Sequence, residues 1–566
     1  MNRILECVPN FSEGRNMDII KQITAQIEAI EGVKLLDIDP GKATNRTVVT
    51  FVGEPEAVVE AAFQAMKKAG ELIDMSKHNG EHPRFGATDV CPFIPISGVS
   101  MEEAAEYARQ LAARVGSELG IPIYLYESAA SQPKRKNLAT VRSGEYEGLA
   151  KKLNNPEWIP DAGPAEFNER VQKTGVTAIG ARDFLVAYNV NINTTSTRRA
   201  NSIAFDVREN GRVKREGNPI TGKIVKDENG NTVRELGACK AVKAIGWYIE
   251  EYAQCQISMN LTNINITPLH IAFDEVCKSA QKRGMRVTGS ELVGLVPLKS
   301  MLAAGRYFLK QQQRSVGVSE AELIHIAIKT MGLDELSPFD PQKKIIEYLL
   351  QDASSAPLLQ MNLLEFANET ASESPAPGGG SISAYVGALG VSLGTMVANL
   401  SAHKRGWDDR WEEFSDWAAQ GQAFKKYLLQ LVDEDTAAFN GIMAAIRLPK
   451  KTDAEKQARK EAMQAATRNA IEVPYRIIET SLASMEVMKA MAKIGNPASV
   501  SDAGVGAACA RTAVIGAFLN VQINAEDLED KDFVNAKLKT GAAMVKYAKA
   551  LETEILEIVE KKILGE

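Results

Sequence analysis

The chain has 566 residues, of which 45% are hydrophobic and 24% are charged, and its formal net charge is −6 at pH 7. A chain of this length is too long to fold around one hydrophobic core, and it suggests about three to four structural units. The composition is that of a soluble globular protein without the basic field typical of nucleic-acid binding. The six cysteines form no C-x-x-C pair, which argues against a disulfide framework or a zinc site. We expect a cytoplasmic protein, since no apolar run near the N-terminus is long enough for a signal peptide.

The first 130 residues alternate between strand and helix patterns. Apolar alternation predicts strands at 4–11, 33–39, 46–53, 88–94 and 121–127, and periodicity predicts helices at 16–30, 55–73 and 101–119. A tight loop at 39–42 makes the second and third strands antiparallel. The expected class is therefore α+β and ferredoxin-like, with the order β-α-β-β-α-β, rather than doubly wound. No G-x-G-x-x-G motif follows any of these strands.

A second α+β subdomain is expected to repeat this plan after a connector, rich in Pro, Gly and Asn, at 150–182. The patterns predict strands at 183–193, 240–248, 253–261 and 292–298, and helices at 195–208 and 267–283. The charged segment 210–235 contains an Asn-Gly pair and predicts an exposed hairpin insertion. We assign no chemistry to that insertion.

The chain becomes helical after Pro297, and proline-marked stretches at 337–342 and 352–357 indicate a hinge. We expect two α+β subdomains at 1–180 and 181–335, a linker at 336–358 and an all-α helical bundle at 359–566. Fragments of about 1–335 and 340–566 are expected to fold separately. Residues 380–400 are uncharged over about a full membrane span. We predict a buried bundle helix instead of a membrane span, because small residues dominate and we count only one such segment.

The densest cluster of ionisable groups lies at 73–95 and contains His78, Glu81, His82 and Arg84. Glycine and proline make this stretch a loop. An imidazole that titrates near neutral pH, a carboxylate and a guanidinium suit proton transfer on an acidic small molecule. Asp39 and Glu81 are candidates to orient the imidazole, and Arg84 is the candidate to hold a substrate carboxylate. The alternative is a surface turn without function.

A second cluster lies in the helical half. Pro377 and three glycines, Gly378, Gly379 and Gly380, precede a helix, so backbone N–H groups there could approach a ligand closely. A flexible linker is the alternative. On the helix at about 415–446, Asp435 falls on the apolar face, whereas Asp433 is rotated by about 200° and should face solvent. A buried carboxylate is costly unless it is used or paired, so Asp435 is a candidate acid or base with a raised pKa, or else a structural aspartate.

Six motifs in this chain resemble those of the formimidoyltransferase-cyclodeaminase family, over essentially the full length. They are ECVPNFSEG at 6–14, ATNRTVVTFVG at 43–53, HNGEHPRFGATDVCPFIP at 78–95, ELVGLVPL at 291–298, SPAPGGGSISA at 374–384 and LVDEDTAAF at 431–439. The resemblance implies two transferase subdomains followed by a helical cyclodeaminase. It also implies that His82 is the catalytic residue of the transferase and Asp435 that of the cyclodeaminase.

The resemblance further implies folate contacts. The folate-binding stretch of the family resembles Gly163, Pro164 and Phe167 and continues toward Gly175, although residues 168–174 are longer and more charged here. Lys240 and Lys243 lie in a region that the family uses for folate. They face either a polyglutamate tail or solvent, and both alternatives stay open.

The expected activity is transfer of a formimino group from N-formimino-L-glutamate to tetrahydrofolate, followed by cyclisation to 5,10-methenyltetrahydrofolate with release of ammonia, in histidine degradation. Tetrahydrofolate, with or without a polyglutamate tail, is then a co-substrate, and no metal, nucleotide, nucleic acid or membrane span is expected. The resemblance implies a homo-oligomer with dimer contacts in both domains. Alternatives are a methenyltetrahydrofolate cyclohydrolase in the C-terminal half, a formyl-donor transferase, and a folate-binding scaffold without turnover.

Overall fold

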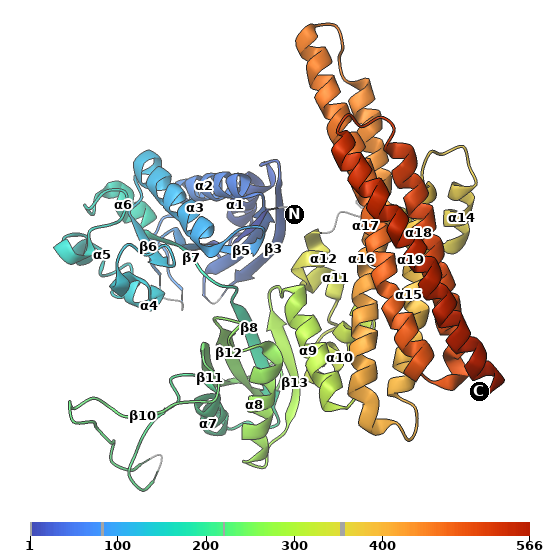
Figure 1. Ribbon diagram of the computed structural model, residues 1–566. Helices are drawn as coiled ribbons and strands as arrows, with labels where there is room; N and C mark the ends of the chain where they lie inside the picture. The colour runs from blue at the N-terminus through green and yellow to red at the C-terminus, as the bar shows by residue number, and fades with distance from the viewer. Residues whose placement is uncertain (1–2, 43, 81–83, 219–220, 351–356, 566) are drawn as a thin grey trace. The chain divides into compact units, whose positions relative to one another are not determined.

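The computed structural model describes residues 3–42, 44–80, 84–218, 221–350 and 357–565. Its contacts divide the chain into two compact units. The first comprises Met1–Pro297 and Gly332–Leu350, and the second comprises Leu298–Met331 and Gln351–Glu566. The first unit carries two sheets with helices, and the second is helical (Figure 1).

A seven-stranded mixed sheet forms the first subdomain. Its strands are β1 (Ile4–Cys7), β2 (Asn10–Phe11), β3 (Val33–Gly41), β4 (Arg46–Gly53), β5 (Thr88–Ser97), β6 (Ile123–Glu127) and β7 (Thr177–Ala181). The first predicted strand is split into β1 and β2, and both lie between β4 and β5. β3 and β4 pair antiparallel, as the tight loop at 39–42 predicted. The predicted ferredoxin-like order is thus confirmed for this part of the sheet.

The helices α1 (Met17–Glu28), α2 (Pro55–Leu72) and α3 (Met101–Arg114) lie along one face of that sheet (Figure 1). In α1, Ile20, Ile23 and Ile27 recur at helical spacing and are almost fully buried, and the side chain of Asn16 caps the N-terminus. Because side chains alternate along a strand, the residues between the buried apolar ones face the other side of the sheet.

The connector prediction was wrong for residues 177–181. They form β7, which lies between β5 and β6 and runs parallel to both. Every residue of β7 is buried, which explains why this short apolar run has no alternating pattern. The rest of the connector contains the short helices α4 (Leu138–Val141), α5 (Leu149–Leu153) and α6 (Glu169–Thr174) and the loops around them.

The second subdomain repeats the ferredoxin-like plan in a four-stranded antiparallel sheet of order β11-β12-β8-β13. Its elements are β8 (Val186–Ile192), α7 (Thr197–Val207), β11 (Val242–Ile249), β12 (Gln254–Leu261), α8 (Leu269–Gln281) and β13 (Val287–Val293). The last strand ends earlier than predicted, because Gly294 adopts a φ of +75° and turns the chain.

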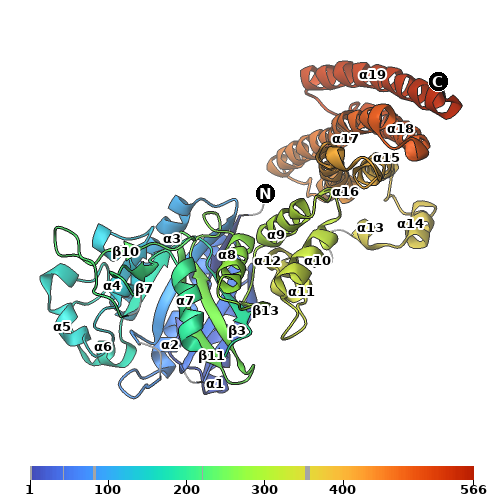
Figure 2. The same cartoon turned by 90° about the horizontal axis from the view of Figure 1, so that it is seen from below.

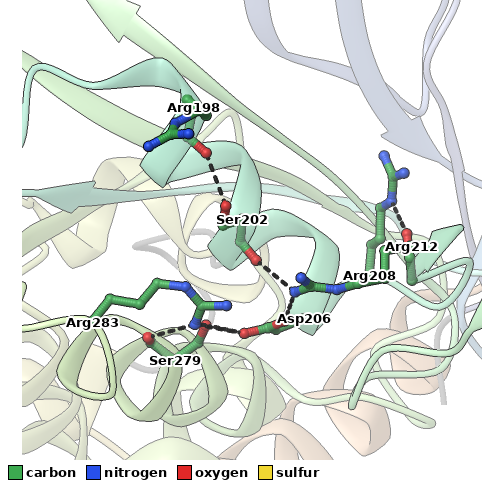
Figure 3. A network of polar contacts seen from close by, with 8 residues as sticks. Arg198, Ser202, Asp206, Arg208, Arg212, Ser279 and Arg283 are labelled. Carbon is green, nitrogen blue, oxygen red and sulfur yellow. Dashed lines mark hydrogen bonds and ion pairs between the residues drawn. The ribbon is translucent and has the colours of Figure 1, made fainter. Parts of the chain in front are cut away.

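The predicted hairpin insertion is present as β9 (Arg212–Val213) paired with β10 (Arg234–Glu235). Figure 3 shows the polar network at its base. Asp206 on α7 binds Arg212 at the start of the hairpin and accepts hydrogen bonds at 2.7 Å from the Ser279 hydroxyl and the Arg283 guanidinium. This network attaches the hairpin base to α7 and to the end of α8.

The second unit is built from long helices. They are α15 (Gly379–Ala402), α16 (Trp411–Arg447), α17 (Asp453–Ile494), α18 (Val500–Asn524) and α19 (Lys531–Leu564), preceded by α13 (Pro357–Gln360) and α14 (Leu363–Thr370). Glycines let α15 approach its neighbours closely, since a Cβ on Gly390 would lie 2.7 Å from the backbone oxygen of Gly506 on α18. Figure 2 shows α19 beside α18 along the bundle.

Two helices from the range predicted as the second subdomain, 181–335, also belong to this unit. Residues of α9 (Leu298–Gln311), α10 (Glu320–Met331) and the loop between them contact α16, where Val316 donates its backbone N–H to the Ser415 hydroxyl at 3.0 Å. The chain then returns to the first unit through α11 (Pro341–Lys344) and α12 (Ile346–Leu350). A cut near residue 335 would therefore separate α9 and α10 from the helices that they contact.

Within the described part of the chain, two helices are long and apolar enough to cross a membrane by length and composition. They are Gly379–Ala402, 61% buried in its most apolar window, and Pro497–Asn524, 44% buried. The prediction of only one segment of this kind from the sequence was therefore wrong. The second was overlooked because Asp502 and Arg511 interrupt its apolar run.

Candidate functional site

Asp435 on α16 lies beside the N-terminus of α15, next to the glycine run of the same sequence cluster. The Ser381 hydroxyl donates to its Oδ2 at 3.2 Å and also lies 2.8 Å from the Val432 carbonyl oxygen. A Cβ on Gly380 would lie 2.1 Å from Asp435 Oδ1, so a side chain there would displace the carboxylate. The structure thus brings the glycine run and Asp435 together at one end of the bundle.

Burial raises the pKa of Asp435, as expected from its place on the helix. Hydrogen bonds from the hydroxyl and backbone N–H of Ser381 oppose this shift because they favour the carboxylate. Gly378 is the N-cap of α15 and Pro377 is buried. On the other side, a Cβ on Gly379 would lie 3.0 Å from the side-chain nitrogen of Asn520 on α18. A half-buried carboxylic acid with polar neighbours is thereby held beside the backbone N–H groups that begin α15, an arrangement suited to proton donation.

Asp433 does not face solvent, contrary to the helical-wheel prediction. It is half-buried and accepts hydrogen bonds from the backbone N–H groups of Leu358 at 3.0 Å and Leu359 at 3.3 Å. The prediction failed because α13 packs against this side of α16, which the sequence of one helix does not reveal. Asp433 is therefore an N-terminal cap for α13.

In the first unit, His82 and Glu81 lie outside the described residues, so their predicted roles stay predictions. His78, four residues earlier, is described. Its Nε2 lies 2.9 Å from the carbonyl oxygen of Asn45, and its Nδ1 is buried without a hydrogen-bond partner among the described residues. His78 therefore packs against the start of β4.

All three guanidinium nitrogens of Arg84 contact other residues of this chain. Its Nε and Nη2 lie 2.8 Å and 2.7 Å from Glu147 Oε1, and its Nη1 donates to the carbonyl oxygens of Met75, at 2.9 Å, and His78. The guanidinium also stacks on Tyr146, 4.6 Å from the ring centroid. In this structure Arg84 holds the histidine loop, and a substrate carboxylate would compete with Glu147.

Two of the predicted folate-binding residues, Phe167 and Gly175, lie close to the segment that contains Arg84. Phe167 packs edge-on against Tyr146 at 6.3 Å, and Gly175 forms a bridge with Gly86 two residues after Arg84. Gly175 and Gly163 both have positive φ values, +64° and +80°, and both approach neighbouring backbone closely. Pro164, next to Gly163, is half-buried. The structure thus brings Phe167 and Gly175 to the histidine loop.

The other predicted residues lie elsewhere in the first unit. Asp39 is exposed on the edge strand β3, where its charge adds to burial in raising the pKa of Asp37. Lys240 and Lys243 are exposed at the start of β11. Lys243 lies near Glu127 at the end of β6, where its charge partly offsets the effect of burial on the pKa of that carboxyl. Both alternatives for these lysines stay open.

Two buried carboxylates of the seven-stranded sheet, Asp89 on β5 and Glu6 on β1, were not predicted from the sequence. Asp89 is 1% exposed and pairs with Arg142 at 2.9 Å and Arg46 at 3.5 Å; burial raises its pKa, and the two guanidinium groups oppose the shift. Glu6 on β1 is 2% exposed, and burial raises its pKa to about 7, with Arg182 opposing. A charged residue inside a predicted strand was the available signal for both.

Comparison with known proteins covers both units. Family models match residues 4–182 ("Formiminotransferase domain, N-terminal subdomain"), 187–351 ("Formiminotransferase domain") and 362–542 ("Formiminotransferase-cyclodeaminase"). The chain is 41% identical over 563 residues to formimidoyltransferase-cyclodeaminase of Mus musculus, covering 99% of this chain and 100% of the relative. The chain belongs to the formimidoyltransferase-cyclodeaminase family.

Single-function relatives match the two halves of this formimidoyltransferase-cyclodeaminase family member separately. Glutamate formimidoyltransferase of Streptococcus pyogenes serotype M1 is 42% identical over 310 residues, covering 55% of this chain and 94% of that protein. Methenyltetrahydrofolate cyclohydrolase of Methylorubrum extorquens is 33% identical over 198 residues, covering 35% of this chain and 95% of that protein. Each half of the family architecture thus also exists as a protein of its own.

Removing the carboxylate of Asp433 is expected to loosen α13 without slowing catalysis. Asp433→Ala removes both acceptors of the α13 backbone N–H groups, and losing such a cap costs about 1 kcal/mol. Hydrogen–deuterium exchange at residues 357–360 should accelerate, while release of ammonia should stay near the wild-type rate. Unchanged exchange in this segment would contradict the capping role.

The pKa of Glu6 predicts a pH dependence of stability for this family member. Because the folded-state pKa is raised from 4.5 to about 7, the folded chain binds the extra proton between these values, and stability falls as pH rises through this window. The loss amounts to about 3 kcal/mol. Pulse proteolysis in urea at pH 5 and pH 7.5 should show most of this loss in the wild type and a much smaller one in Glu6→Gln. Equal pH dependence in both proteins would contradict the assignment.

Proposed function

We propose that the chain catalyses two consecutive steps on folate. N-formimino-L-glutamate first donates its formimino group to N5 of tetrahydrofolate, which leaves glutamate. N10 then attacks the formimino carbon, ammonia departs and 5,10-methenyltetrahydrofolate remains. The observation that carries this proposal is the match to a bifunctional relative, which covers 99% of this chain and 100% of that protein.

The chemistry of ring closure, the second step, supports a role for Asp435 as the proton donor. An amide-like nitrogen leaves as ammonia only after protonation, and a carboxylic acid whose pKa is raised by burial holds a transferable proton closer to neutral pH. The glycine run would admit the pterin to the start of α15, beside that carboxyl. Neither step changes an oxidation state, so tetrahydrofolate is proposed as co-substrate, with no metal or nucleotide.

The setting of the reaction belongs to the same proposal. We infer that the protein works in the cytoplasm, in histidine degradation, and as a homo-oligomer with dimer contacts in both domains. The family resemblance supports these inferences. Exposed apolar side chains on α15 and α18, among them Leu389, Leu519 and Ile523, are consistent with contact between copies. Sedimentation velocity of the purified chain tests the assembly, and a monomer at micromolar concentration would contradict it.

The activity is tested with purified protein, N-formimino-L-glutamate and tetrahydrofolate, following ammonia and methenyl absorbance together. Both should rise in equal amounts. The second candidate, a cyclohydrolase in the C-terminal half, is favoured by the identity to the Methylorubrum extorquens enzyme. It would consume added 5,10-methenyltetrahydrofolate without releasing ammonia. A formyl-donor transferase would use a formyl compound instead, and binding without any product would indicate a folate-binding scaffold.

A further inference from the structure

A pocket of about 470 Å³ opens between the C-terminal half of α15 and the N-terminal half of α16. It is lined by Ser392, Thr395, Met396, Asn399, Leu400, His403, Gln422 and Lys425. Lys425 precedes Asp435 by ten residues on α16, which places the two about 15 Å apart along the helix axis. The pocket is therefore separate from the carboxyl group proposed for ring closure.

One loop fixes the polar floor of this pocket. The carbonyl oxygen of Gly317, between α9 and α10, accepts hydrogen bonds from the side-chain amides of Asn399 at 2.8 Å and Gln422 at 3.1 Å. A Cβ on Gly317 would lie 2.2 Å from the Cβ of Ala418, so only glycine allows the loop to reach this depth. The Asn399 Oδ1 is left buried without a hydrogen-bond partner among the described residues. Two carboxamides are thus held in place while one acceptor remains free.

Lys425 supplies a half-buried positive charge without a counter-ion. Within the described ranges its ammonium has no ion pair or hydrogen bond, whereas the ammonium of the neighbouring Lys426 lies 2.9 Å from Glu320. Burial lowers the pKa of Lys425, because desolvation disfavours the charged ammonium. Arg314 and Glu322 act on the pKa of His403 in opposite directions and pair with each other at 3.5 Å. Among the described residues that line the pocket, Lys425 carries an ammonium and His403, whose pKa burial lowers, is the other titratable group.

The remaining wall is apolar. Met396 and Leu400 are 39% and 47% exposed, although they lie on a helix that is otherwise largely buried. α15 ends at this pocket, so it offers carbonyl oxygens rather than the free N–H groups that bind phosphate. A pocket of this size with one cation, two carboxamides and an apolar wall has the composition of a small-molecule site.

We propose that this pocket binds a small organic monocarboxylate with an apolar body. The carboxylate binds the Lys425 ammonium, and the apolar part covers Met396 and Leu400. One cation matches one carboxylate. This site goes beyond the two folate steps and does not use the residues proposed for them.

Benzoate is the probe, with its neutral analogue benzamide as control, titrated into the full chain and followed by ligand-observed NMR. Benzoate should bind, and benzamide should bind about 10- to 100-fold more weakly, the usual effect of losing a charge-assisted hydrogen bond. Lys425→Met should weaken benzoate binding by the same factor, whereas Lys426→Met should not, and both variants should keep formimino transfer. No benzoate binding to the wild type, or equal binding to Lys425→Met, overturns the proposal.

A labelling experiment on the wild type avoids any dependence on folding of variants. Acetylation of Lys425 and Lys426 is followed in the same peptide by mass spectrometry, with and without benzoate. Benzoate should protect Lys425 and leave Lys426 unchanged, and benzamide should protect neither. Equal labelling of Lys425 with and without benzoate overturns the proposal.

Discussion

Asp435→Asn is expected to stop the release of ammonia while formimino transfer continues. The asparagine keeps the shape of the side chain and can still accept the hydrogen bond from the Ser381 hydroxyl, but it has no transferable proton. Loss of a general acid lowers a rate by about 10²- to 10⁴-fold. The variant should accumulate 5-formimino-tetrahydrofolate, which chromatography of the reaction mixture would detect.

Asp433→Asn is the matched control, because it changes the same group two residues away on the same helix. Its amide oxygen can still accept from the α13 backbone, so the wild-type rate of ammonia release is expected. The Asp435 assignment is wrong if the two variants behave alike, or if Asp435→Asn releases ammonia at the wild-type rate.

The rate of ammonia release by the wild type should also fall as pH rises above the raised pKa of Asp435, since only the protonated acid donates a proton.

His82→Ala is expected to abolish formimino transfer and to leave cyclisation intact. The proposed role of His82 is to accept the proton from the attacking N5 and return it to the departing glutamate nitrogen. The expected loss is about 10²- to 10⁴-fold. The variant supplied with 5-formimino-tetrahydrofolate should still release ammonia at the wild-type rate, which separates the two steps in one preparation.

His78→Ala is the control for this prediction. The imidazole of His78 contacts the Asn45 carbonyl oxygen at 2.9 Å and belongs to the support of the loop. A moderate loss of stability with transfer retained is therefore expected. If His82→Ala transfers the formimino group at nearly the wild-type rate, His82 is not the catalytic residue. If His78→Ala instead shows the full loss of transfer, the catalytic role belongs to His78.

Helices and strands whose apolar residues recur at a regular spacing were predictable from the sequence. The isoleucines of α1 and the alternating strands of both sheets specified the ferredoxin-like order, because each pattern reports which residues one element buries. β7 was missed because a strand buried on both faces has no alternation. The separation of α9 and α10 from the first unit depends on contacts such as Val316 with Ser415, which lie 99 residues apart in sequence.

The same limit applies to the site. The position of Asp435 on the apolar face of α16 followed from helical spacing, and the glycine run beside it followed from composition. The capping role of Asp433, the attachment of Arg84 to Glu147, and the burial of Asp89 between two arginines depend on partners from other elements. A single helix or strand pattern contains no information about such partners.

The most direct test of two separate steps in one chain is to mix two inactive variants. His82→Ala and Asp435→Asn are each assayed alone and then together, with N-formimino-L-glutamate and tetrahydrofolate, following ammonia release. Each variant alone should release almost no ammonia. The mixture should release it after a lag, because the Asp435→Asn protein makes 5-formimino-tetrahydrofolate and the His82→Ala protein cyclises it. A mixture as inactive as its components would contradict the account.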